Sequence, residues 1–105
     1  MAVSKERWFP LSLAEQLGHI GSEVGRAAKW QGKDTSSFWG AVTRALELFD
    51  LTQEDSRWQG RRHELDRARE SFADAVLGGG EYQSTLPDLE RYFIPFALLA
   101  AQSAR

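Results

Sequence analysis

Cysteine is absent from this chain of 105 residues, and histidine occurs only twice. Without cysteine, neither a disulfide bond nor a metal site with thiolate ligands can form. The two histidines, His19 and His63, do not have the spacing of paired metal ligands. No nucleophile motif accompanies them. The sequence therefore predicts no metal site and no cofactor.

The chain also lacks a long hydrophobic segment. Its longest apolar run, residues 93–101, has nine residues, about half of what a membrane-spanning helix requires. Residues 1–10 carry charges and no extended apolar stretch, which is atypical of a secretion signal. We therefore expect a cytoplasmic protein that has no membrane partner.

A large excess of charge of one sign is missing as well. The formal net charge is −2, with 27% charged and 42% hydrophobic residues, which is ordinary for a globular domain. This balance disfavours a general electrostatic attraction to nucleic acid or anionic lipid, but it is compatible with a local basic patch. The length suffices for one domain with a modest core.

Glycine, by contrast, is concentrated where a helix is expected. Within residues 13–31, apolar side chains recur at the spacing of one helix face, and a second stripe beside them contains only small residues. Each glycine in a helix costs roughly 1 kcal/mol relative to alanine, so a close contact has to offset that cost. We expect the contact with another helix, in the same chain or across a dimer; a ligand that approaches the bare backbone is the third alternative. The small-residue stripe consists of Ala14, Gly18, Gly21, Gly25 and Ala28.

The remaining pattern predicts an all-α fold. We expect a lead-in segment over residues 1–11 and a single-domain four-helix bundle over residues 12–105. Short connections favour antiparallel neighbours, and hence an up-down-up-down bundle. Pro95 lies inside the fourth helix and is expected to kink it. The predicted helices cover residues 12–31, 35–50, 57–77 and 86–101.

The fourth predicted helix is apolar on every side in its second half. Each helix of a four-helix bundle is peripheral, so one side of it cannot be covered by the same bundle. We expect an interface there with a second copy or a small partner protein, because exposed apolar patches mark interaction sites. Cover by residues 8–11 of the lead-in is the alternative. The interface candidates are Phe93, Ile94, Phe96, Leu98 and Leu99.

Arginine is concentrated in the third predicted helix. The basic residues are spread over several of its faces, which indicates a solvated, ion-paired surface more than a nucleic-acid-binding stripe. A nucleic-acid accessory role is the alternative, and RNA binding stays open without being favoured. That role would use Arg57, Arg61, Arg62 and Arg67.

Two residues of opposite charge fall on the expected helix seams. Arg69 lies on the core seam of the third predicted helix, and Glu90 on the apolar face of the fourth. Antiparallel packing about the glycine-rich joint at residues 78–80 would bring them together, so we predict a buried ion pair. The alternative is a polar cleft that these groups form with Arg62 for an anionic ligand.

Three parts of the sequence carry a family resemblance: SLAEQLGHIGSEV at 12–24, RALELFDLT at 44–52, and the pairs Tyr92-Phe93 and Phe96-Ala97. With them the chain resembles, over nearly its whole length, a group of short bacterial and archaeal all-α proteins without an assigned function. More distantly, its layout resembles the HEPN and nucleotidyltransferase-substrate-binding helical bundles. That resemblance implies a small dimer, often paired with a minimal nucleotidyltransferase in a toxin–antitoxin module.

Nuclease members of the HEPN family carry an arginine followed, after four to six residues, by a histidine. Arg57 and His63 are separated by five residues and fit this spacing, although Trp58 occupies a position that is usually polar. The resemblance then implies a metal-independent ribonuclease. Its histidine would act as acid or base on a ribose hydroxyl, and its arginine would bind the phosphate.

Taken together, the sequence favours a non-enzymatic helical-bundle interaction module, which forms a homodimer or docks a small protein partner through its fourth helix. A nucleotidyltransferase is the partner that the family resemblance implies. The HEPN-type ribonuclease and the nucleic-acid accessory protein are the alternatives.

Overall fold

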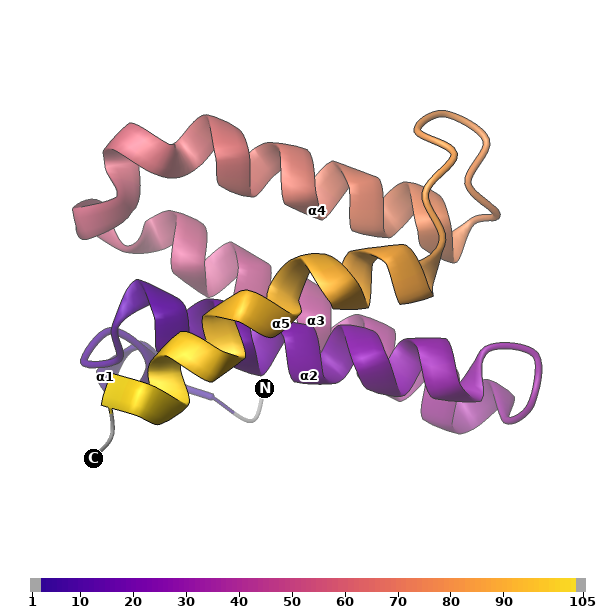
Figure 1. The fold of residues 1–105 in the computed structure, drawn as a ribbon, viewed down its shortest axis with the longest axis horizontal. Helices are drawn as coiled ribbons and strands as arrows, with labels where there is room; N and C mark the ends of the chain where they lie inside the picture. Colours follow the sequence, from indigo (N-terminus) through magenta and orange to yellow (C-terminus); the bar gives the residue numbers. More distant parts are fainter. Residues whose placement is uncertain (1–2, 104–105) are drawn as a thin grey trace.

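The computed structural model describes residues 3–103, and every regular element in this range is a helix (Figure 1). Four long helices are accompanied by one short helix and a 3₁₀ segment, so the all-α prediction is confirmed. Residues 1–2 of the predicted lead-in segment and residues 104–105 of the predicted bundle lie outside the described range. The elements are α1 (Lys5–Trp8), α2 (Leu13–Trp30), α3 (Thr35–Glu54), η1 (Ser56–Arg61), α4 (Arg62–Val76) and α5 (Leu86–Ser103).

Helix α2 begins at a reciprocal cap. The Ser12 hydroxyl accepts a hydrogen bond from the Glu15 backbone N–H at 3.1 Å, and the Glu15 carboxylate accepts one from the Ser12 N–H at 2.9 Å. This capping box satisfies two of the N–H groups that are free at a helix start. The apolar face of α2 is buried, with Leu17, Ile20 and Val24 almost inaccessible to solvent.

Helix α3 begins at Asp34, whose carboxylate accepts from the Ser37 N–H at 3.0 Å. The helix continues to Glu54, beyond its predicted end at residue 50. Leu51 and Thr52 are buried, so tertiary packing extends the helix through a segment whose polar composition predicts a turn.

The third predicted helix is shorter than expected. Its first residues form the 3₁₀ segment η1, in which Trp58 has the non-helical angles φ −104° and ψ 17°. The Asp55 carboxylate accepts from the Arg57 backbone N–H at 3.1 Å and so caps this tighter turn. At the other end Gly78 and Gly79 have positive φ angles of 110° and 77°, a backbone conformation that stops α4.

Successive long helices run antiparallel, and α2 packs on both α3 and α5 (Figure 1). Helix α5 crosses α2 obliquely, while α4 lies at the far side of the bundle. Phe49 of α3 contacts Phe72 of α4 and Phe93 of α5, with ring centroids 6.1 and 6.0 Å away. All three rings are buried, and this aromatic core joins α3, α4 and α5.

Helix α5 also starts with a reciprocal cap, between Thr85 and Asp88, at distances of 3.1 and 3.2 Å. The helix continues through Pro95 and ends two residues beyond the predicted end at residue 101. Pro95 removes one backbone N–H, but the turns on either side keep the helix continuous. Within the described residues, no helix combines the length and the apolarity that crossing a membrane would take.

Candidate functional site

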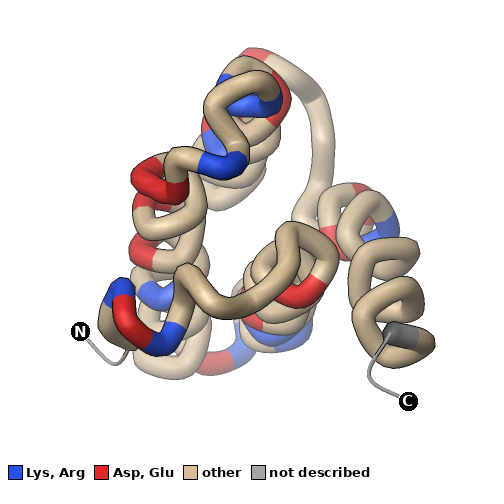
Figure 2. The backbone as a smooth tube through the Cα atoms, turned by 90° about the vertical axis from the view of Figure 1, so that its left-hand side faces the viewer, with Lys and Arg blue, Asp and Glu red and all other residues tan. Residues whose placement is uncertain are grey.

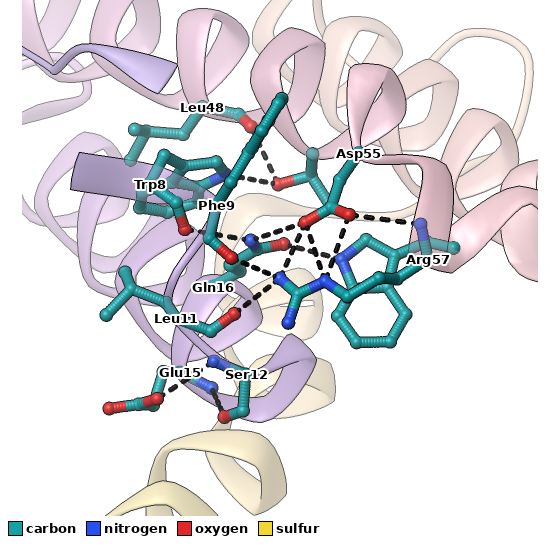
Figure 3. Close-up of polar contacts among 11 residues, drawn as sticks. Trp8, Phe9, Leu11, Ser12, Glu15, Gln16, Leu48, Asp55 and Arg57 are labelled. Carbon is teal, nitrogen blue, oxygen red and sulfur yellow. Dashed lines mark hydrogen bonds and ion pairs between the residues drawn. The ribbon is translucent and has the colours of Figure 1, made fainter. Parts of the chain in front are cut away.

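A buried polar cluster joins the N-terminal segment to the bundle (Figure 3). At its centre, the Gln16 side chain of α2 is fully buried. Its amide nitrogen donates to the Trp8 carbonyl oxygen at 3.0 Å and to the Asp55 carboxylate at 3.2 Å. Its amide oxygen accepts from the Trp58 indole N–H at 2.9 Å. We call this cluster the N-terminal anchor: Trp8, Gln16, Thr52, Asp55, Arg57 and Trp58.

Thr52 gives the anchor its contact with α3. The Trp8 indole N–H donates to the Thr52 hydroxyl at 3.0 Å, and this hydroxyl donates to the Leu48 carbonyl oxygen at 2.9 Å. Trp8 and Thr52 are both buried, so these bonds remove the free-energy cost of unsatisfied polar groups. They hold α1 against α3.

Arg57, one of the two predicted catalytic residues, belongs to this anchor. Its Nη2 atom donates to the carbonyl oxygens of Phe9 at 2.6 Å and Leu11 at 2.7 Å. The same guanidinium binds Asp55 at 2.6 Å, and these hydrogen bonds hold the pKa of the Asp55 carboxyl at about 2, against an ordinary 3.8. Arg57 therefore ties the N-terminal segment to η1. Its side chain is still 43% exposed, and the hydrogen bonds to these partners use the Nε and Nη2 atoms.

A pocket of about 280 Å³ opens between α4 and α5. On its rim the Tyr92 hydroxyl donates to the Glu64 carboxylate at 3.2 Å. Partial burial, and then the Glu64 charge, raise the pKa of Tyr92 above its ordinary value. Sequence reasoning missed this pocket, because hydrophobic periodicity does not give the relative placement of two helices. We call it the α4–α5 pocket; it is lined by His63, Glu64, Arg67, Ala68, Ser71, Leu89 and Tyr92.

His63, the second predicted catalytic residue, is exposed on α4 and lines the α4–α5 pocket. Arg57 lies in the N-terminal anchor, and no hydrogen bond joins the two side chains within residues 3–103. The two residues thus take part in different sites, even though their sequence spacing fits the nuclease motif.

The other arginines of the predicted basic stripe have protein partners of their own. Arg61 pairs with Glu64 at 2.8 Å, and Arg62 donates to a backbone carbonyl oxygen of α3 at 3.0 Å. Arg67 lies over the Tyr82 ring, 5.4 Å from the ring centroid. In the view of Figure 2, both acidic and basic positions are scattered over the helices. This arrangement is typical of an ion-paired surface.

The predicted ion pair between Arg69 and Glu90 is wrong. Arg69 Nε instead donates to Asp50 Oδ1 at 3.0 Å, which joins α4 to α3. Glu90 faces α2, where its Oε2 atom lies 2.6 Å from the position that a Cβ atom on Gly25 would occupy. The physical reason is the course of α5, which packs on α2 in preference to α4. The predicted cleft of these two groups with Arg62 is therefore not formed.

The small-residue stripe of α2 lies against α5. A Cβ atom on Gly18 would lie 3.2 Å from the Ala97 Cα atom, and one on Gly21 would lie 2.4 Å from the Phe93 Cβ atom. The second distance is far below van der Waals contact, so this close approach requires a residue without a side chain. The contact forms within one chain and accounts for the glycines without a second copy.

The outer face of α5 is apolar and exposed. Ile94, Leu98 and Leu99 retain 46%, 61% and 52% of their accessible surface. Phe93, in contrast, is 1% exposed and belongs to the core, so its predicted place in an interface is wrong. Phe96 is partly buried against the same core.

The lead-in segment does not cover this face. Trp8 is buried in the core and bonded to α3, and Phe9 and Leu11 also pack on the core cluster. Figure 2 shows α1 and the C-terminal half of α5 on opposite sides of the bundle. The sequence predicts that Ile94 and Leu98 are covered by a second chain or by residues 8–11 of the lead-in. The second alternative is therefore excluded.

Among residues 3–103, no group of three or more histidine, aspartate or glutamate side chains is arranged to hold a metal ion. The structure places the chain among small all-α proteins with a helical bundle. Comparison with known proteins gives no significant match, whether to a family model, to a curated protein or to a solved structure.

Proposed function

We propose that this protein is a homodimeric interaction module, in which two copies meet through the outer face of α5. The observation that carries the proposal is the exposure of Ile94 and Leu98, one helical turn apart on this face. Exposed apolar surface of this kind marks interaction sites in soluble proteins. Ile94 and Leu98 are 46% and 61% exposed, so burying what remains of their surface would contribute roughly 1 kcal/mol for each side chain.

The spacing of the exposed residues suits packing of one helix on another. Ile94, Leu98 and Ala101 follow one another at intervals of four and three residues and so form a stripe along α5. Ala97 lies beside this stripe, where α5 meets Gly18 of α2. Intervals of four and three residues are the spacing with which apolar side chains form a seam between two packed helices.

The chemistry of the face favours a second copy as the occupant. No Asp, Glu, Lys or Arg occurs between residues 92 and 103. In a two-fold dimer the same patch occurs on both sides, so an uncharged patch brings no like charges together. A partner of different chemistry would find no charge here to recognise, whereas an identical apolar stripe is complementary to it.

The experiment is a measurement of molar mass by light scattering over a range of micromolar concentrations. We expect a dimer for the parent protein and a monomer for Leu98→Glu, because the new carboxylate would be buried without a partner. Leu77→Glu is the matched control, since Leu77 is 82% exposed on a different element and should leave the dimer intact. A monomeric parent protein, or a dimeric Leu98→Glu variant, would contradict the proposal.

The two enzymatic and nucleic-acid alternatives have weaker support. The Nε and Nη2 donors of Arg57 are engaged by Asp55 and by two carbonyl oxygens of the N-terminal segment. Arg61 and Arg62 also have acceptors in the protein. A nucleotidyltransferase partner, a toxin–antitoxin context and a cytoplasmic location stay expectations of the sequence.

A further inference from the structure

We propose that the α4–α5 pocket binds a small aromatic molecule that carries an anionic group. The ring would lie on Ala68 and Leu89, and the anion would contact Arg67, His63 and Ser71. This site is independent of the proposed dimer, because Tyr92 on the pocket rim and Ile94 on the outer face point about 160° apart around α5.

The first observation is a row of unused donors. His63, Arg67 and Ser71 are spaced four residues apart, so they follow one another along the same face of α4 and line the pocket. Within residues 3–103, none of these three side chains has a hydrogen bond or an ion pair. The other four arginines between residues 57 and 69 all donate to an acceptor. Arg67 alone among these five keeps its donors available while lying at a pocket.

The second observation is the apolar floor. Leu89 is almost fully buried and Ala68 is partly buried, so together they give the pocket an apolar base. The Tyr92 ring stands at the rim, where it can pack against an aromatic ligand in an offset or edge-to-face arrangement. A cavity of about 150 Å³ holds one benzene ring, so the 280 Å³ pocket has room for a ring and one substituent.

The third observation concerns charge. Glu64 also lines the pocket, but its carboxylate accepts from Arg61 at 2.8 and 3.0 Å and from the Tyr92 hydroxyl. Glu70, one turn from Arg67, accepts from the Tyr82 hydroxyl at 3.0 Å. Both acidic groups are thus engaged, and the Arg67 guanidinium is the charge at this rim that has no counterion. A guanidinium next to a hydroxyl and an imidazole is suited to a carboxylate or a phosphate monoester.

The test uses phenyl phosphate and benzoate as probes, each titrated into ¹⁵N-labelled protein and followed by amide chemical shifts. We expect saturable shifts confined to residues 63–71 and 89–92 with at least one of the two probes, and the stronger probe identifies the anionic group. Inorganic phosphate and benzyl alcohol, which each carry half of the chemistry, should bind at least tenfold more weakly.

The variant Arg67→Gln should weaken binding of the stronger probe at least tenfold. Arg91→Gln is the matched control, because it removes the same charge from an exposed site on α5 that lies outside the pocket. Ala68→Leu should block the floor and abolish binding, with circular dichroism to verify the fold. The proposal is overturned if neither probe saturates, if inorganic phosphate or benzyl alcohol binds equally well, or if Arg67→Gln and Arg91→Gln behave alike.

Discussion

At the scale of single residues, the ion pair of Asp55 and Arg57 shifts the pKa of a buried carboxyl strongly. Asp55 is only 4% exposed, yet its carboxylate is charged, because Arg57 and Gln16 donate hydrogen bonds to it. Asp55 is thus a buried charge with its partners in place, whereas Arg57 is 43% exposed. Removing the partners of a buried charge is costly, because the charge is then left without compensation.

Replacing Asp55 by asparagine should lower the free energy of unfolding by about 2 kcal/mol at neutral pH. The carboxyl has a pKa of about 2 in the folded protein against an ordinary 3.8, so it binds protons more readily when unfolded. Its contribution is therefore complete above about pH 5 and is lost as the pH falls toward 2. Urea denaturation of the parent and of Asp55→Asn between pH 7 and pH 2 measures this difference.

The two stability curves should converge toward pH 2. Glu64→Gln serves as the control, because Glu64 lies in an exposed ion pair whose loss should matter little at any pH. A constant gap between parent and Asp55→Asn over the whole range would show that the charge of Asp55 is not the cause of its effect.

The hydrogen-bond partners of these residues could not be predicted from sequence patterns. Gln16 lies between Leu13 and Ile20 on the apolar face of α2, but the local sequence does not indicate which groups its buried amide binds. Its partners come from residue 8 and from residues 55 and 58, far along the chain. Arg57 likewise fits a nuclease spacing in the sequence, but spacing does not indicate that its guanidinium binds Asp55 and two backbone carbonyl oxygens in the fold.

At the scale of helices, the contact between α2 and α5 depends on the absence of side chains. A Cβ atom on Gly21 would lie 2.4 Å from the Phe93 Cβ atom, which neither backbone can relieve without a shift. We therefore expect Gly21→Ala to lower the free energy of unfolding by about 1–3 kcal/mol through overpacking, as measured by urea denaturation.

Gly40→Ala is the matched control for this prediction. Gly40 is also inside a helix, and a Cβ atom there would meet only the flexible end of Arg44 at 3.4 Å. Because alanine is the better helix former, this variant should be up to about 1 kcal/mol more stable than the parent. The two substitutions are chemically identical, so opposite signs isolate the helix contact. Equal effects would mean that the approach of α5 is not tight.

Helix positions were predictable, whereas helix partners were only partly so. The capping residues Ser12 and Asp34 and the glycines after α4 fix the helix limits locally, and the structure follows them. The glycine stripe indicates that a helix comes close, but not which one. The predicted pair of Arg69 and Glu90 requires that α4 and α5 lie side by side, whereas α5 packs obliquely on α2.

At the scale of the whole molecule, the apolar content of α5 exceeds what one chain buries. The sequence indicates this excess through the apolar run at residues 93–101. In the structure, some residues of this run are buried and others are exposed. Phe93 enters the core, whereas Ile94 and Leu98 face solvent. Periodicity alone does not make this division, since the whole run is apolar and only the crossing of α5 over α2 decides which side is inside.

The proposed dimer predicts a melting temperature that depends on protein concentration. If two copies unfold together, mass action stabilises the folded dimer by about 1.4 kcal/mol for each tenfold rise in concentration, which corresponds to roughly 3–6 °C for a unit of this size. Differential scanning calorimetry of the parent over a hundredfold concentration range measures this slope. Leu98→Glu, as a monomer, should melt at one temperature throughout, while Leu77→Glu should keep the slope of the parent. A parent protein whose melting temperature stays constant over that range would unfold as a single chain, and the outer face of α5 would then not join two copies.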